Sequence, residues 1–278
     1  MGASTALALA ADLPTHKGPP PAPYVAPPIF TWSGFYGGIN AGGEWGSGAT
    51  TVSTDPGFID RAALSAGGIA HATDFATGAN AKSSGGSAFV YGAQAGYNWQ
   101  FSSIVAGFET DIQGFGGSSK SGSVTNLAQT AALETPVSVT VSGQNKLDYL
   151  GTVRGRAGYL FTPTLLAYAT GGLAYGGVKS SASVSGFETV PGGTVSTPTF
   201  GSSSNKRVGW TLGAGAEWMF MANWSVKAEY MYYDLGRATY ALPPFVGTIG
   251  AATVFSHTPV VSARFDGNLA RLGLNYHF

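Results

Sequence analysis

Apolar and polar residues alternate along the chain from Trp32 onward, and the alternation recurs in eight segments. In the clearest one, odd positions from Phe89 to Phe101 carry aromatic residues or alanine, whereas even positions from Gly92 to Gln100 carry glycine, glutamine or asparagine. A period of two places successive side chains on opposite faces of a β-strand. The pattern therefore predicts eight strands, at 32–44, 87–101, 104–113, 147–161, 165–175, 208–220, 224–234 and 268–278. Only the faces of 165–175 stay unassigned, because its two phases are similar.

Short and long connections strictly alternate between these segments. The short ones are 102–103, 162–164 and 221–223, and the long ones are 45–86, 116–144, 177–206 and 236–264. Bacterial outer-membrane barrels combine short periplasmic turns with long extracellular loops, whereas loops of about thirty residues are rare in compact soluble domains. The spacing predicts an all-β fold, an eight-stranded antiparallel up-and-down transmembrane β-barrel with four long extracellular loops and periplasmic N- and C-termini.

Aromatic residues cluster beside the three short turns: Trp99, Phe101, Phe161, Trp218, Phe220 and Trp224. At that level they would form the girdle that transmembrane barrels place at the membrane interface. The alternative is a soluble β-sandwich or lipocalin-like barrel, in which the same apolar phase would face the core. Its exterior would then consist of glycine, asparagine, glutamine and only a few charges, which disfavours that alternative.

The low content of charged residues supports a membrane location. Asp, Glu, Lys and Arg make up only 10% of the chain, compared with about 25% in an ordinary soluble domain. The net charge of +0 provides no basic stripe for a phosphate backbone, so we expect outer-membrane lipid rather than nucleic acid as a partner. Because the chain has no cysteine, disulfides, thiolate metal sites and cysteine nucleophiles are excluded.

The beginning of the chain differs in composition from the rest. Residues 1–11 are small and apolar and end in an A-x-A pattern at Ala8 and Ala10, which is typical of the tail of a secretory signal peptide. A disordered N-terminus is the alternative. Residues 12–30 form a proline-rich leader that favours an extended polyproline II path. The predicted organisation is a residual signal peptide at 1–11, the leader at 12–30 and the barrel at 31–278.

Eight charged residues fall in the polar phase of the predicted strands and would point into the barrel. They are Glu109, Asp111, Arg154, Arg156, Glu217, Lys227, Glu229 and Arg271, four of each sign. Side chains just fill the interior of an eight-stranded barrel, and buried charges persist only when they are paired. We therefore predict a lumenal salt-bridge network that plugs the barrel. A narrow ion path lined by these charges is the functional alternative, and a proton-transferring enzyme site is a weaker one.

No catalytic or metal-binding motif is found in the sequence. The four histidines, His16, His71, His257 and His277, have no partner at metal-ligand spacing. The glycine pairs do not match a nucleotide-binding pattern. We expect no catalytic residue, no metal site and no cofactor, and hence a protein that is not an enzyme.

Four blocks of the sequence also resemble a known family. They are FTWSGFYGGINAG at 30–42, GFETDIQG at 107–114, LGTVRGRAGY at 150–159 and GLNYHF at 273–278. With the proline-rich leader, they are similar to the small outer-membrane immunogenic, porin-family proteins of alphaproteobacteria. The resemblance implies an OmpA-like eight-stranded fold. It also implies a C-terminal signal for the barrel-assembly machinery, which maps onto Leu272, Leu274, Tyr276 and Phe278.

The sequence leaves the role within this family open. Relatives are described as haem-binding proteins, as envelope-structural antigens or as host-contact proteins, and no motif here selects among them. The leading hypothesis is a non-enzymatic outer-membrane protein that supports envelope integrity and presents surface loops. The alternatives are a narrow porin for small solutes or ions, and a haem-binding or adhesive surface receptor that binds a host or extracellular ligand through its long loops.

Overall fold

The computed structural model describes most of the chain from residue 30 onward. The described residues are 2, 30–46, 49–54, 57–59, 79, 81–83, 86–117, 119–128, 137–190, 193–196, 198–249 and 252–278. The signal-peptide and leader predictions, at 1–11 and 12–30, therefore fall almost entirely outside the described residues. No helix in the described ranges is long and apolar enough to cross a membrane.

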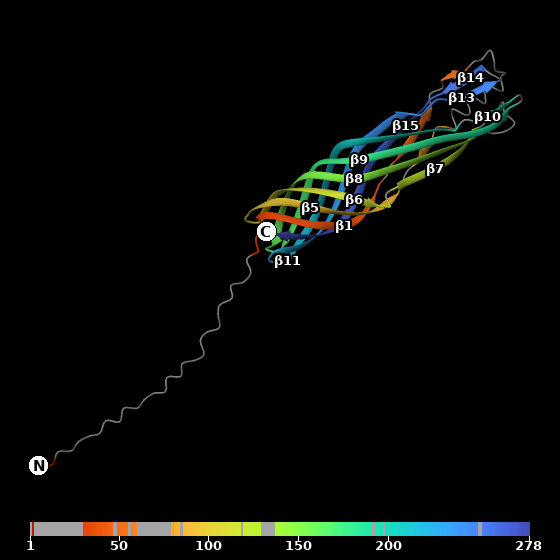
Figure 1. Ribbon diagram of the computed structural model, residues 1–278. Coiled ribbons are helices and arrows are strands. Elements are labelled where there is room, and N and C mark those ends of the chain that lie inside the picture. The colour runs from red at the N-terminus through yellow and green to blue at the C-terminus, as the bar shows by residue number, and fades with distance from the viewer. Residues whose placement is uncertain are drawn as a thin grey trace.

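Eight antiparallel strands form a closed ring (Figure 1). They are β1 (Gly34–Trp45), β5 (Ser87–Phe101), β6 (Ile104–Gly116), β8 (Val137–Thr162), β9 (Leu165–Val190), β11 (Thr199–Met221), β12 (Trp224–Ala241) and β15 (Pro259–His277). Each of these strands pairs with the next one along the chain. The ring closes because β1 also pairs with β15, with Ile39 opposite Leu274. The predicted eight-stranded all-β fold is confirmed.

Shorter strands continue the structure at the end of the barrel that lies away from the C-terminus (Figure 1). They are β2 (Thr50–Thr54), β3 (Phe58–Ile59), β4 (Ala81–Ser83), β7 (Ser119–Ala128), β10 (Gly193–Ser196), β13 (Phe245–Ile249) and β14 (Ala252–His257). The strands β2, β4, β7 and β10 join the main sheet, whereas β13, β14 and β3 form a separate three-stranded sheet. We call this end of the barrel the far end and the other the short-turn end.

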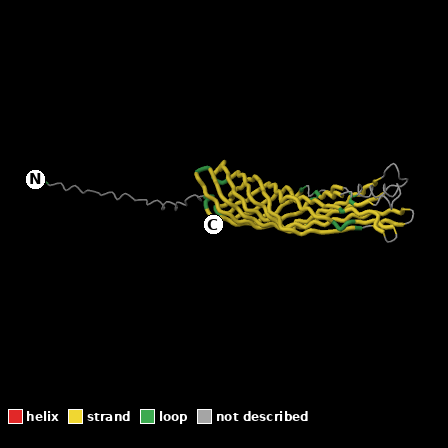
Figure 2. The backbone as a smooth tube through the Cα atoms, turned by 90° about the horizontal axis from the view of Figure 1, so that it is seen from above, coloured by secondary structure: helices red, strands yellow, loops and turns green. Residues whose placement is uncertain are grey.

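The barrel strands run much further than the sequence pattern predicts. Figure 2 shows them as long, continuous strands. The strands β8 and β9 have 26 residues each, and β11 has 23. Parts of the expected loops 116–144 and 177–206 are therefore strand. In these parts the outward positions are rich in serine, so the difference in hydropathy between successive residues is small. The inward positions are still apolar, as at Val139, Val141 and Val184.

The two phases of each strand face opposite sides of the ring. On β1, Phe35 and Ile39 are 63% and 66% exposed, whereas Tyr36 and Asn40 are buried. On β9, whose faces the sequence leaves open, the buried Leu166 marks the inward phase. The apolar phase therefore faces outward, as a transmembrane barrel requires, and the soluble alternative with an apolar interior phase does not apply.

Glycine at inward positions leaves room for large side chains in this narrow ring. A Cβ atom at Gly96 would lie 2.5 Å from the hydroxyl oxygen of Tyr36. One at Gly215 would lie 2.8 Å from the hydroxyl oxygen of Tyr168. Both distances are shorter than van der Waals contact, so these two tyrosines can point into the barrel only because the facing positions lack a side chain.

Apolar clusters fill the interior at three levels. The cluster at the short-turn end contains Trp32, Val105, Leu160, Leu166, Tyr168 and Met219. The middle cluster contains Val90, Leu147, Leu150, Ala174, Val178, Met231, Tyr233, Leu235, Ala238, Ala263, Phe265 and Leu269. The cluster at the far end contains Val52, Ala79, Val139, Val141, Ala182, Val184, Leu242, Phe255 and Val261. Between the first and the middle cluster the inward residues are polar, and this level holds the candidate site.

Candidate functional site: the charged interior of the barrel

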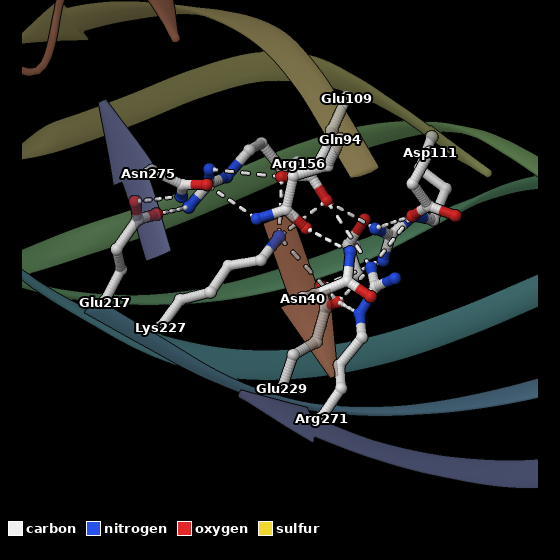
Figure 3. A network of polar contacts seen from close by, with 12 residues as sticks. Asn40, Gln94, Glu109, Asp111, Arg156, Glu217, Lys227, Glu229, Arg271 and Asn275 are labelled. Carbon is white, nitrogen blue, oxygen red and sulfur yellow. Dashed lines mark hydrogen bonds and ion pairs between the residues drawn. The ribbon is translucent and has the colours of Figure 1, made fainter. Parts of the chain in front are cut away.

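All eight charged residues that were expected in the lumen lie at this polar level. Two-residue spacing along a strand keeps pairs such as Glu109 and Asp111 on one face. The set comprises Glu109 and Asp111 on β6, Arg154 and Arg156 on β8, Glu217 on β11, Lys227 and Glu229 on β12, and Arg271 on β15. None is more than 4% exposed. Figure 3 shows the charged side chains converging from different walls of the ring, so the structure brings the whole set together.

Arg154 lies at the centre of the network. Its Nη2 atom donates to Asp111 Oδ2 at 2.7 Å and also to Glu109 Oε1, and its Nη1 atom donates to Glu229 Oε1 at 2.9 Å. Three carboxylates from two strands thus share one guanidinium group. Charge-assisted hydrogen bonds of this kind are stronger than neutral ones, and the planar guanidinium fixes their directions.

Arg271 and Lys227 complete the pairing of the same carboxylates. Arg271 Nε donates to Glu229 Oε2 at 2.7 Å, and Arg271 Nη2 donates to Asp111 Oδ2 at 2.8 Å. Lys227 Nζ lies 2.8 Å from both carboxylate oxygens of Glu109. Each of the three carboxylates therefore accepts hydrogen bonds from two cationic side chains, which compensates for the water that burial removes.

Arg156 and Glu217 form a second branch that extends toward the short-turn end. Arg156 Nη2 donates to Glu217 Oε2 at 2.7 Å. The guanidinium carbon of Arg156 also lies 4.1 Å from the centre of the Tyr168 ring, which is a cation–π contact. Tyr36 joins the two branches, because its hydroxyl donates to Glu109 Oε2 at 2.7 Å and accepts from Arg156 Nη1 at 3.0 Å. The charged residues thus form one continuous network.

Uncharged polar residues extend the network, and the sequence-based prediction does not include them. Asn275 Nδ2 and Ser225 Oγ donate to Glu217 Oε1 at 2.7 and 2.6 Å. Gln94 Nε2 donates to Asn275 Oδ1 at 2.6 Å, and Gln94 Oε1 accepts from Asn40 Nδ2 at 3.0 Å. These residues occupy the same inward positions of their strands as the charged residues do. That shared position in the alternation is the feature of the sequence that could have identified them.

The network is balanced in charge and enclosed on both sides. Four carboxylates face three arginines and one lysine. Buried Leu166 and Met219 lie toward the short turns, and buried Leu150 and Met231 lie toward the far end. The arrangement therefore suits structural pairing of the charges.

The histidines do not form a metal centre in the part of the chain that the structure describes. No group of three or more His, Cys, Asp or Glu side chains in these ranges could hold a metal ion. His277 Nε2 lies 2.9 Å from Ser225 Oγ and 3.6 Å from Glu217 Oε1, so it continues the polar network toward the short turns. His16 and His71 fall outside the described residues.

Two aromatic bands lie on the outer face of the barrel. The band that was expected at the short turns consists of residues that are 38% to 67% exposed, namely Trp99, Phe101, Phe161, Trp218, Phe220 and Trp224. A second band includes Trp45 and Tyr230, with ring centres 6.2 Å apart, and Trp210 and Tyr232, with ring centres 5.3 Å apart. Paired aromatic bands that flank an apolar zone are typical of transmembrane barrels.

The residues of the predicted assembly signal lie on the outer face of the last strand: Leu272, Leu274, Tyr276 and Phe278. The ring centre of Tyr276 lies 5.1 Å from those of Trp224 and Phe278. The backbone nitrogen of Phe278 donates to Phe35 O at 3.0 Å, at the seam where the ring closes. The placement makes these side chains accessible from outside the barrel, and their role in assembly stays a prediction.

The chain is similar to known outer-membrane proteins. The 31 kDa outer-membrane immunogenic protein of Brucella melitensis is 35% identical over 273 residues, which cover 98% of this chain and 93% of that protein. The 22 kDa outer membrane protein of Rhizobium leguminosarum is 29% identical, over 77% of this chain and 76% of that protein. The crystal structure of OprG from Pseudomonas aeruginosa aligns with 90% of this chain and 99% of its own, with a TM-score of 0.38 and 12% identity.

The family described as outer membrane protein beta-barrel domain matches residues 31–278, which include the whole ring and every member of its charged network. This match and the relative that is 35% identical over nearly the full length show that the chain belongs to that family and is a protein of the cell outer membrane.

Proposed function

We propose that this protein is a closed, non-enzymatic barrel that supports the integrity of the outer membrane and carries its extended strand ends to the cell surface. The observation that carries the proposal is the filled interior. Arg154 and Lys227 are each 1% exposed at the polar level, and Leu166 and Met231 are fully buried on either side of it. An aqueous path through the barrel would require these side chains to move apart, which would break the pairing of the charges.

In this proposal both termini face the periplasm and the far end faces the outside. Short turns on the periplasmic side and long segments on the extracellular side are the rule in bacterial barrels. The long strands β8, β9 and β11 support a surface role, because they continue well beyond the second aromatic band. The Brucella melitensis relative is named an immunogenic protein, which agrees with such exposure.

Cysteine labelling in intact cells tests this orientation cleanly, because the chain has no cysteine of its own. Thr125→Cys places a thiol on an exposed position of β7 near the far end, and Thr162→Cys places one beside a short turn. A membrane-impermeant maleimide should label the first variant in intact cells and the second only after the outer membrane is permeabilised. The reverse pattern would overturn the proposed orientation.

A further inference from the structure

Three lysines gather on the outer wall of the barrel. Lys146 on β8 and Lys179 on β9 are direct cross-strand partners, and their side chains are 51% and 55% exposed. Lys206 on β11 is also exposed and lies diagonally beside Lys179, since the direct partner of Lys179 is Ser204. Three ammonium groups thus share one face of three adjacent strands.

The lysines carry more charge than their surroundings neutralise. In the described part of the chain, ion pairs join them to one carboxylate, that of Asp148. Asp148 Oδ2 lies 2.8 Å from Lys179 Nζ, and Asp148 Oδ1 lies 3.7 Å from Lys146 Nζ. One carboxylate against three ammonium groups leaves a surplus of positive charge on this wall.

The lysines lie where the apolar zone of the barrel ends. On β9, Tyr175 is two outward positions away from Lys179, and on β11, Val208 and Trp210 are the next two outward positions after Lys206. These three neighbours are 36% to 71% exposed on the lipid-facing side. Aromatic residues mark the membrane interface, and basic residues just beyond them meet lipid headgroups. The lysines are therefore at headgroup level.

Two connected hollows give this wall the shape of a binding site. The first, of about 370 Å³, is lined on its outward side by Gln144, Lys146, Lys179, Ser181, Ser202 and Ser204. The second, of about 690 Å³, continues along the same wall, shares Gln144, Ser181 and Ser202 with the first, and includes Phe200, which is 78% exposed. Hydroxyl and amide groups suit hydrogen bonds to sugar hydroxyls, and an exposed aromatic ring suits the apolar face of a sugar.

We propose that this wall binds a phosphorylated glycolipid of the outer leaflet. Its phosphate would lie on Lys146 and Lys179, its sugars along the serine-lined hollow toward Phe200, and its acyl chains on the apolar zone below. The phosphate, the sugars and the acyl chains of such a lipid thus match the lysines, the serine-lined hollow and the apolar zone of the wall. A soluble phosphosugar would leave the apolar zone unmatched. The inference rests on the proposed orientation, in which the far end of the barrel faces the outside.

Native mass spectrometry of the purified full-length protein in detergent tests this site, with diphosphoryl lipid A as the probe. The K146Q/K179Q variant should bind the probe about tenfold more weakly than the wild type, because each lysine near an anionic headgroup adds severalfold to the affinity. The K82Q/R237Q variant removes two exposed basic groups elsewhere and should bind as the wild type does. Heat-modifiable mobility in gels checks that both variants are folded.

Equal binding by the wild type and K146Q/K179Q would overturn the proposal, and so would an equal loss in both variants. Displacement of lipid A by an equal concentration of inorganic phosphate would reduce the site to a phosphate site and overturn the glycolipid assignment. Binding of phosphatidylglycerol as tight as that of lipid A would do the same, since a general anionic-lipid surface would then suffice. The cysteine labelling decides the orientation separately, so the two failures are distinguishable.

Discussion

Arg154 and Arg264 both pair with carboxylates, but one lies inside the barrel and the other on its outer wall. The side chain of Arg154 is fully buried and contacts three carboxylates, whereas that of Arg264 is 39% exposed and lies 2.6 Å from Asp234. Loss of one partner inside a low-dielectric interior leaves charges that water cannot stabilise. At the surface, solvent screens the charge that is left without a partner, so the loss of that partner costs less.

We expect Arg154→Gln to lower the free energy of unfolding by about 3–5 kcal/mol, the range for breaking a buried pair. Arg264→Gln should lower it much less, because solvent screens the exposed pair of Arg264 with Asp234. Urea unfolding in lipid vesicles, followed by tryptophan fluorescence, measures both variants. A similar small loss in the two would show that the interior network contributes little to stability.

The inward glycines allow a second comparison at the residue scale. Gly96→Ala places a methyl group against the Tyr36 hydroxyl and should destabilise the barrel by about 1–3 kcal/mol, as overpacking does. Gly43→Ala is the matched control, because a Cβ atom there has nothing within 4 Å. A Cβ atom at Gly96 would also lie 2.5 Å from the backbone oxygen of Phe108. The same unfolding assay measures both variants, and a tolerated Gly96→Ala would mean that both Tyr36 and the neighbouring backbone can shift.

The charged members of the network can be predicted from the sequence. Each lies in the polar phase of a strand whose other phase faces lipid, so its side chain must point into the barrel. The uncharged members are harder to recognise. Asn275 and Ser225 contact Glu217 directly, yet asparagine and serine are equally common in turns and loops. Distances across the ring, such as the Arg154 to Glu229 contact between β8 and β12, depend on closure and cannot be read from one strand.

At the scale of the elements, the sequence pattern locates the strands but not their outer limits. It depends on the contrast between lipid-facing apolar residues and inward polar ones. Beyond the membrane that contrast reverses: Val141 and Val184 point inward, while Ser123 and Ser142 face outward and share a hydrogen bond of 3.2 Å. A segment in which serine alternates with valine has the composition of a loop. The sequence pattern therefore predicts loops where β8, β9 and β11 extend beyond the membrane.

The last strand, β15, is followed directly by the terminal aromatic residue of the proposed assembly signal. Phe278→Ala should reduce the fraction of protein inserted in the outer membrane, because the proposed assembly signal would lose its terminal aromatic residue. Phe200→Ala is the control, since Phe200 is 78% exposed and Phe278 is 80% exposed. Fractionation and heat-modifiable mobility measure insertion. Equal insertion of both variants would exclude Phe278 as part of the signal.

For the whole molecule, closure follows from features that the sequence does show. Eight amphipathic strands with alternating short and long connections leave no unpaired edge only if the first strand meets the last. The β1–β15 pairing from Tyr36 opposite His277 to Trp45 opposite Asn268 satisfies that requirement. The three apolar clusters were not predicted, because the residues that form them come from many strands and meet only in the closed ring.

In the proposed function, the side chains that fill the ring also block the passage of solutes. Recording currents across planar lipid bilayers that contain the purified protein tests it most directly, with a general porin reconstituted at the same protein-to-lipid ratio as the positive control. The filled interior predicts no discrete conductance steps from this protein at voltages at which the porin conducts. Stable unitary steps whose size changes when Arg154 or Glu109 is neutralised would contradict the account and establish an ion path through the charged network.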